Sequence, residues 1–119
     1  MIRYVQQPTF QTCGQACISM LSDFPIEDVI RTMKTKGPTS IGQLIEALDY
    51  YGIKHAERNK RISKANPKYS DVSILTVHMP NYSHWVLHYK SKFYDPEFGV
   101  LDKCHEDGKI TSFLDIYLD

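Results

Sequence analysis

The sequence is short of cysteine, carries no excess of charge of either sign and contains no long apolar run. Its 119 residues include three cysteines, too few for the disulfide framework of a small secreted domain. Fourteen basic and 14 acidic residues give a formal net charge of zero, so no global field draws the protein toward nucleic acid or an anionic membrane. No segment approaches the roughly 18 apolar residues of a membrane span. We therefore expect neither nucleic acid nor membrane as a partner.

The first ten residues, MIRYVQQPTF, lack the apolar core of a signal peptide. Together with the odd number of cysteines, this favours free thiols in a reducing compartment, and we expect cytoplasmic residence. Delivery by a dedicated secretion system would leave no mark on the sequence. A hydrophobic content of 42% and a charged content of 24% are ordinary for a globular chain. We predict a single domain over residues 1–119, and no motif calls for a cofactor.

The first half of the chain has helical periodicity. A helix is expected from Cys13 to about Leu21, and Thr12 with Gln15 forms the pattern of a capping box at its start. A second helix is expected after Pro25, ending at Gly37.

A third helix is expected after Thr39 or Ser40, with Gly52 as its C-terminal stop. The period then changes to that of strands, bounded by turn residues. Strands are predicted at Val72–Met79, His84–Tyr89, Phe93–Asp95 and Gly99–Leu101, and the final Thr111–Leu118 segment suits a short helix or an edge strand. Helices followed by antiparallel strands define an α+β fold, with N-terminal helices packed on a C-terminal sheet.

A cluster of basic residues without an intervening acid precedes the strands. We interpret it as a solvated loop, and a docking patch for an acidic partner is the alternative. The cluster consists of Arg58, Lys60, Arg61, Lys64 and Lys68.

The stretch QPTFQTCGQAC places Cys13 at the start of the first helix. Unpaired N–H groups and the helix dipole favour an anion there, which predicts a lowered pKa for the Cys13 thiol. Gly14 would leave the thiol open to a substrate. A cysteine nucleophile also needs a base, a group that orients the base and donors for the oxyanion. Gln7 is placed to serve as such a donor.

The same residues resemble a known family. Gln7, Cys13 and Gly14, followed by HWVLHY and FYDPEFG, are similar in order and spacing to the double-glycine leader peptidases, which are papain-like cysteine peptidases that process bacteriocin precursors. The resemblance covers roughly residues 4 to 101.

The resemblance implies a papain-like fold and assigns four roles. Cys13 would be the nucleophile, His84 the general base, Asp95 the residue that orients the base, and Gln7 the oxyanion donor. The implied function is that of a cysteine peptidase or amidohydrolase acting on a peptide or protein amide.

Each assignment has an alternative. Cys13 would pack as a small hydrophobe at a helix start, and Asp95 would be a plain turn residue before Pro96. His88 shares the strand face of His84: a hairpin turning at Ser91-Lys92 sets Asp95 opposite His88, and one turning at Tyr89-Lys90 sets it opposite His84.

The remaining cysteines favour structural interpretations. Cys17 is expected in the core, and Cys104 with His105 in an exposed turn. A zinc site built from Cys13 and these three residues is not expected, because their spacing is atypical of zinc ligands. We also expect Trp85 to be a core residue rather than a wall of the substrate site.

Three functional hypotheses follow. The first is a peptidase. The second is a glutamine deamidase or transglutaminase-like effector or toxin of the same fold, for which an inhibitory or immunity protein is a conceivable partner. The third is an inactive papain-like module that only binds a peptide.

Overall fold

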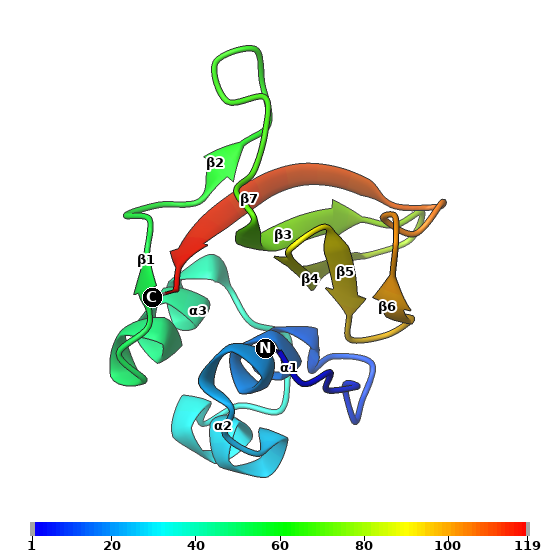
Figure 1. Ribbon diagram of the computed structural model, residues 1–119. Helices are drawn as coiled ribbons and strands as arrows, with labels where there is room; N and C mark the ends of the chain where they lie inside the picture. Colours follow the sequence, from blue (N-terminus) through cyan, green and yellow to red (C-terminus); the bar gives the residue numbers. More distant parts are fainter. Residues whose placement is uncertain (1, 119) are drawn as a thin grey trace.

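The computed structural model describes residues 2–118, with the helices in the first half and the strands in the second (Figure 1). This confirms the predicted α+β fold class, a small compact domain with three helices and an antiparallel sheet. The helices are α1 (Cys13–Ser22), α2 (Ile26–Met33) and α3 (Ile41–Tyr50). The strands are β1 (Lys54–His55), β2 (Lys60–Arg61), β3 (Val72–His78), β4 (Ser83–Tyr89), β5 (Lys92–Asp95), β6 (Gly99–Leu101) and β7 (Lys109–Tyr117).

All strand pairs are antiparallel, in the order β1-β7-β3-β4-β5-β6, with β2 also pairing with β7. Of the two alternatives for the C-terminal segment, the strand is therefore confirmed and the helix is wrong, but the edge position is also wrong because β7 is an interior strand. The physical reason is its burial: Phe113, Leu114 and Ile116 are all in the core, on both faces of the sheet. The two-residue strands β1 and β2 were not predicted, since two residues are too few to show a period.

The β4–β5 hairpin turns at Lys90 and Ser91, both with positive φ (46° and 74°). Positive φ at both central residues is the geometry of the two-residue turn that matches strand twist. Tyr89 pairs with Lys92 and Leu87 with Tyr94. Continuing this register sets Asp95 beside Val86, midway between the two histidines, so neither alternative for the turn position is correct.

The helix ends differ from the sequence expectation at two places. Thr12 makes no side-chain cap, because its Oγ1 bonds to Thr9 instead, and Gln15 is buried and donates to the carbonyls of Thr35 and Gly37. The predicted capping box is therefore wrong. The second helix ends at Met33, before Gly37, because Lys34 adopts a left-handed conformation with φ 59°.

The third helix begins and ends where the sequence predicts. Ser40 and Gln43 form a reciprocal capping box at its start. Gly52 follows its end with φ 71°, and the N–H of Ile53 returns to the carbonyl of Leu48. This pattern of a left-handed glycine with a closing hydrogen bond is the Schellman motif.

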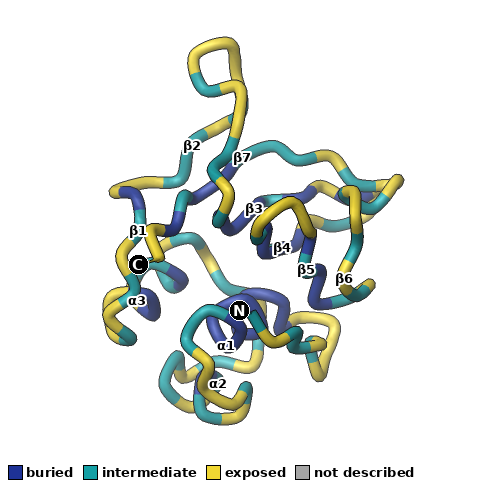
Figure 2. Tube along the Cα trace, in the orientation of Figure 1, coloured by how far each residue is buried: buried dark blue, intermediate teal, exposed yellow. Residues whose placement is uncertain are grey.

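Two apolar clusters occupy the two faces of the sheet. One joins the helices to Ile74, Leu87 and Leu114, and it contains the fully buried Cys17, which confirms that residue as core. The other contains Leu75 and Val86 on the far face. Figure 2 shows the burial concentrated in α1 and the central strands.

Strand alternation fixes the direction of the β4 side chains. Trp85 and Leu87 pack on the cluster shared with the helices, and Val86 packs on the other cluster. By alternation, His84 and His88 share the face of Val86 rather than that of Trp85 and Leu87. This placement controls the geometry of the candidate site.

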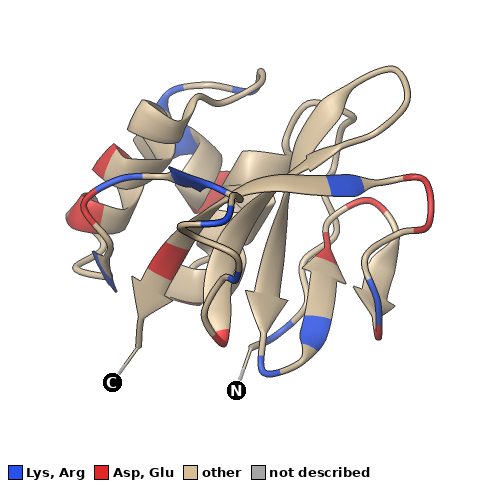
Figure 3. Ribbon diagram, turned by 90° about the horizontal axis from the view of Figure 1, so that it is seen from above, with Lys and Arg blue, Asp and Glu red and all other residues tan. Residues whose placement is uncertain are grey.

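The basic segment is in part a strand and in part a projecting loop. Lys60 and Arg61 form β2, which pairs with β7, and the following residues extend away from the sheet toward the top of Figure 1. In Figure 3, the basic and acidic residues are dispersed along the ribbon rather than gathered on one side. Over residues 2–118, no helix has the length and apolarity required to cross a membrane.

Candidate active site

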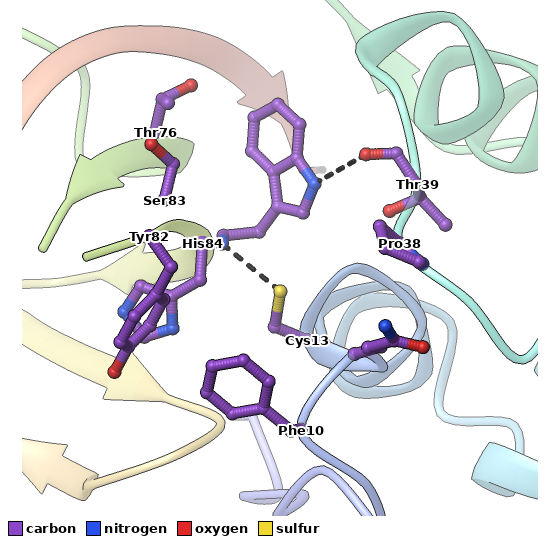
Figure 4. A pocket seen from close by; sticks show the side chains of 10 residues that line it. Phe10, Cys13, Pro38, Thr39, Thr76, Tyr82, Ser83 and His84 are labelled. Atoms are coloured by element: carbon purple, nitrogen blue, oxygen red, sulfur yellow. Dashed lines mark hydrogen bonds between the residues drawn. The ribbon is translucent and has the colours of Figure 1, made fainter.

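Cys13 and His84 line one cavity of about 280 Å³, where the start of α1 meets the start of β4. Figure 4 shows this cavity with Phe10 and Tyr82 beside the two residues. Trp85 also lines it, and its indole Nε1 donates to the carbonyl of Thr39 over 3.1 Å. Trp85 is therefore both a core residue and a wall of the cavity, which corrects the expectation that it belongs to the core alone.

The Cys13 sulfur is held by the backbone of β4. The N–H of Trp85 donates to Sγ over 3.4 Å, and Cys13 as a whole is 8% exposed. Burial raises the pKa of the Cys13 thiol, although the N–H groups of Trp85, Gly14 and Cys13 act in the opposite direction. The predicted lowering of this pKa is therefore wrong for this arrangement: the helix start contributes as expected, but desolvation outweighs it.

Gly14 has a packing role. A Cβ at this position would lie 2.0 Å from Oγ1 of Thr39 and 3.1 Å from atoms of both Leu44 and Trp85. The absence of a side chain thus allows α1 to approach the segment before α3. The interpretation of Gly14 as an opening for substrate stays a prediction.

The His84 ring lies between two carboxylates. Its Nε2 is 3.6 Å from Oδ2 of Asp95 and its Nδ1 is 3.7 Å from Oε1 of Glu97. Both distances exceed hydrogen-bonding range, and neither ring nitrogen has a hydrogen-bond partner among the described residues. The side chain is only 4% exposed, and this burial lowers the pKa of His84 in spite of the two carboxylates.

Asp95 is fixed at the end of β5. Its Oδ1 accepts hydrogen bonds from the backbone N–H groups of Glu97 (2.9 Å) and Phe98 (3.2 Å), which leaves Oδ2 directed at His84. Burial raises the pKa of the Asp95 carboxyl, against the opposing effects of His84 and the two N–H donors. Burial therefore favours the neutral forms of both residues.

The structure brings Cys13, His84 and Asp95 to one place but does not join the first two. Within residues 2–118, no hydrogen bond links Sγ of Cys13 to a nitrogen of His84. In Figure 4 the sulfur points to the backbone nitrogen of β4 and the imidazole lies beside Tyr82, with ring centroids 5.8 Å apart. Proton transfer from Cys13 to His84 thus requires one or both side chains to change position.

Gln7 lies outside the cavity lining. Its side-chain Nε2 donates to the carbonyls of Thr9 and Phe10, so both amide hydrogens support the loop before α1. Its backbone N–H donates to the carbonyl of Pro96 over 2.9 Å. The backbone N–H groups of Cys13 and Gly14 act on the sulfur, and the oxyanion role of Gln7 stays a prediction.

His88 has a different environment from His84. Its ring packs against those of Tyr69 and Phe93, with centroids 4.8 and 5.0 Å away. Cys104 and His105 are half-buried rather than exposed, and the His105 ring stacks on Phe98 at 4.2 Å. No group of three or more potential metal ligands is found in the part of the chain that the structure describes.

Sequence reasoning missed Glu97 and Tyr82. Tyr82 Oη donates to Oε1 of Glu97 over 2.6 Å, and this oxygen faces His84. A carboxylate two residues after Asp95, in the turn between two short strands, was the available signal.

Comparison of the sequence with models of known families and with curated proteins finds no match.

Proposed function

We propose that the protein is a papain-like cysteine peptidase or amidohydrolase with Cys13 as nucleophile, His84 as base and Asp95 as the residue that orients the base. The observation that carries the proposal is the shared cavity: a cysteine at a helix start and a buried histidine line the same space. Asp95 supports it, since its carboxylate stands behind the imidazole at 3.6 Å.

Each half of the reaction moves one proton to His84 and one proton away from it. With Nε2 of His84 toward Asp95, Nδ1 takes the proton from the Cys13 thiol as the sulfur attacks the amide carbonyl. The C–N bond then breaks, His84 returns the proton to the leaving amine, and a thioester remains on Cys13. Water next gives one proton to His84 and its oxygen to the carbonyl carbon. The C–S bond breaks, and the sulfur recovers the proton.

Developing negative charge on the carbonyl oxygen needs donors. The first N–H groups of an α-helix have no partner within the helix, and those of Cys13 and Gly14 lie at the sulfur. Gln7 would add a side-chain donor if one of its hydrogen bonds to Thr9 or Phe10 opened.

The same chemistry gives three outcomes. Attack on a peptide bond followed by water hydrolyses the peptide; attack on a glutamine side-chain amide releases ammonia, and water then leaves glutamate; an amine in place of water receives the acyl group. Peptide hydrolysis is the first choice because of the resemblance carried by Cys13, His84 and Asp95. A peptide or protein is then the substrate.

The experiment compares wild type with Cys13→Ala on a defined library of peptides, read by mass spectrometry. New termini that require Cys13 support a peptidase. A gain of about 1 Da on glutamine identifies a deamidase, because an amide nitrogen is replaced by oxygen in the acyl transfer to water. Products of equal yield with Cys13→Ala would refute the assignment of the nucleophile.

A peptide-binding module is the second candidate, and one observation favours it. The thiol is buried and bonded to the backbone of Trp85, while both His84 nitrogens face carboxylates. In that case the cavity binds a peptide without turnover. Retention of a library peptide equally by wild type and Cys13→Ala, with no product from either, would support this function.

A further inference from the structure

The turn between β5 and β6 supplies both carboxylates that face His84. Asp95 is immobilised by two backbone N–H donors and its side chain is 3% exposed. Glu97 is 25% exposed and depends on a single side-chain partner, the hydroxyl of Tyr82. Of the two carboxylates, Glu97 is therefore the one that is free to move.

Glu97 faces Nδ1 of His84, the ring nitrogen that would accept the proton of Cys13. When Nε2 faces Asp95, Nδ1 is the atom available to take the Cys13 proton. In the structure Nδ1 faces Glu97 at 3.7 Å and is buried without a hydrogen-bond partner. A buried polar atom without a partner is costly, so a rotation that gave Nδ1 a partner would be favoured once space allowed it.

Tyr82 connects this arrangement to the cavity. Its ring lines the cavity and packs against Phe10, with centroids 4.9 Å apart, and Phe10 is 61% exposed. A ligand that enters the cavity would therefore meet Tyr82 and Phe10. The titratable groups around His84 are Tyr82, Asp95, Glu97 and, beyond the ring of Phe98, His105, and Cys13 lines the same cavity.

We propose that Glu97, tethered by Tyr82, is a positioning residue that holds His84 turned away from Cys13, and that opening the Tyr82–Glu97 hydrogen bond lets the ring turn to the sulfur. The inference rests on the proposed function, because it describes how the same cysteine and histidine are kept apart at rest. In the ligand-free protein, the Tyr82–Glu97 hydrogen bond keeps His84 apart from Cys13, and a ligand entering the cavity can displace that bond.

The test uses the full chain and two readouts that need no substrate. The first is the pKa of the His84 ring by NMR, and the second is the rate of Cys13 alkylation by iodoacetamide at pH 7. The variants are Glu97→Ala and Tyr82→Phe, and Glu106→Ala is the control, since Glu106 is an exposed carboxylate in the loop before β7.

Glu97→Ala is expected to speed Cys13 alkylation, because His84 is then free to turn to the sulfur. The His84 pKa is expected not to fall, because the thiolate beside the turned ring replaces the negative charge of Glu97. Each unit by which the Cys13 pKa falls raises the thiolate fraction roughly tenfold at a pH below that pKa. Tyr82→Phe is expected to speed alkylation in the same direction although the carboxylate is retained. The increase should vanish in Glu97→Ala/His84→Ala, and Glu106→Ala should match wild type.

Unchanged alkylation in both Glu97→Ala and Tyr82→Phe would overturn the inference, as would an increase that persists without His84. These results are separate from the proposed function. The positioning role of Glu97 can be refuted while Cys13-dependent products are still formed. It can also be supported while the peptide library yields no product.

Discussion

The backbone N–H of Trp85 donates to Sγ of Cys13 over 3.4 Å, which joins the first residue of α1 to β4. This contact holds the thiol in a buried position, with no hydrogen bond to the imidazole of His84, the residue before Trp85. The hydrogen bond itself lowers the pKa of the Cys13 thiol, but the burial that accompanies it raises the pKa by more, because desolvation opposes the charge that the helix dipole would favour.

The resting thiol is expected to titrate above its ordinary value. Burial raises the pKa of Cys13, whereas the unfolded chain should titrate near about 8.5. We expect the alkylation midpoint of Cys13 to be higher in native wild type than in the urea-unfolded protein. The rate is measured against pH by mass spectrometry of the peptide that contains Cys13. A native midpoint at or below the unfolded one would contradict the placement of Sγ.

Gly14→Ala is expected to destabilise the fold by about 1–3 kcal/mol, since the new methyl group overpacks the contact between α1 and Thr39. The Cβ would lie 2.0 Å from Oγ1 of Thr39, and this clash outweighs the helix propensity gained. Urea unfolding measures the change. Thr39→Ala in the same chain should restore part of the loss.

Gly42→Ala is the matched control for this change. Gly42 is an exposed residue of α3 whose added Cβ would make only an ordinary contact, at 3.7 Å from Ser40. A gain of about 0.5–1 kcal/mol is expected there. Equal effects of the two glycine substitutions would contradict the packing role of Gly14.

Asp95 is expected to cost stability at neutral pH while it supports function. Burial raises its pKa, so the folded state binds its proton more tightly than the unfolded state and stability is gained as pH falls toward the unfolded value of about 3.9. Asp95→Asn should be at least as stable as wild type at pH 7, because its side-chain oxygen can still accept from Glu97 and Phe98.

Asp95→Ala should instead lose about 1–3 kcal/mol, because two backbone N–H groups lose their acceptor. Urea unfolding at pH 7 and pH 4 compares the three proteins. The advantage of Asp95→Asn over wild type should shrink at pH 4. An advantage that grew at pH 4 would contradict the raised pKa.

Burial of His88 is expected to lower the free energy of unfolding in acid. Burial lowers its pKa, so the unfolded state takes up the proton first, and stability present above about pH 6.5 is lost as the pH falls through that value. The measurement is the free energy of unfolding of wild type and His88→Gln at pH 7.5 and 5.5. Wild type should lose more between the two pH values. Parallel losses would show that His88 is not the group responsible.

Sequence patterns predicted the fold where the signal was long or local. The apolar run in β3 and the helical spacing of α3 both gave the observed elements. Two similar capping patterns had different outcomes: Ser40 with Gln43 forms the box, whereas Thr12 with Gln15 does not. Gln15 is buried and bonds to carbonyls near the end of α2, a tertiary contact that the local sequence does not encode.

The candidate site was predictable as a set of residues but not as a geometry. The family resemblance pointed to Cys13, His84 and Asp95, and the structure places the first two in one cavity lining and Asp95 beside His84. The direction of His84 depends on the alternation of β4 and on the β5–β6 turn, which brings Glu97 to its ring. The direction of the His84 ring and the position of Glu97 cannot be derived without the register of the β4–β5 hairpin.

The most direct test of the central claim is whether Cys13 becomes acylated. The protein is incubated with a library of peptide p-nitroanilides and quenched in acid, and the peptide that contains Cys13 is examined by mass spectrometry. The account predicts an acyl mass on Cys13 together with release of p-nitroaniline, both abolished in Cys13→Ala and strongly reduced in His84→Ala. Release of p-nitroaniline that persists in Cys13→Ala, or the absence of any acyl group on Cys13 in both wild type and Glu97→Ala, would contradict it.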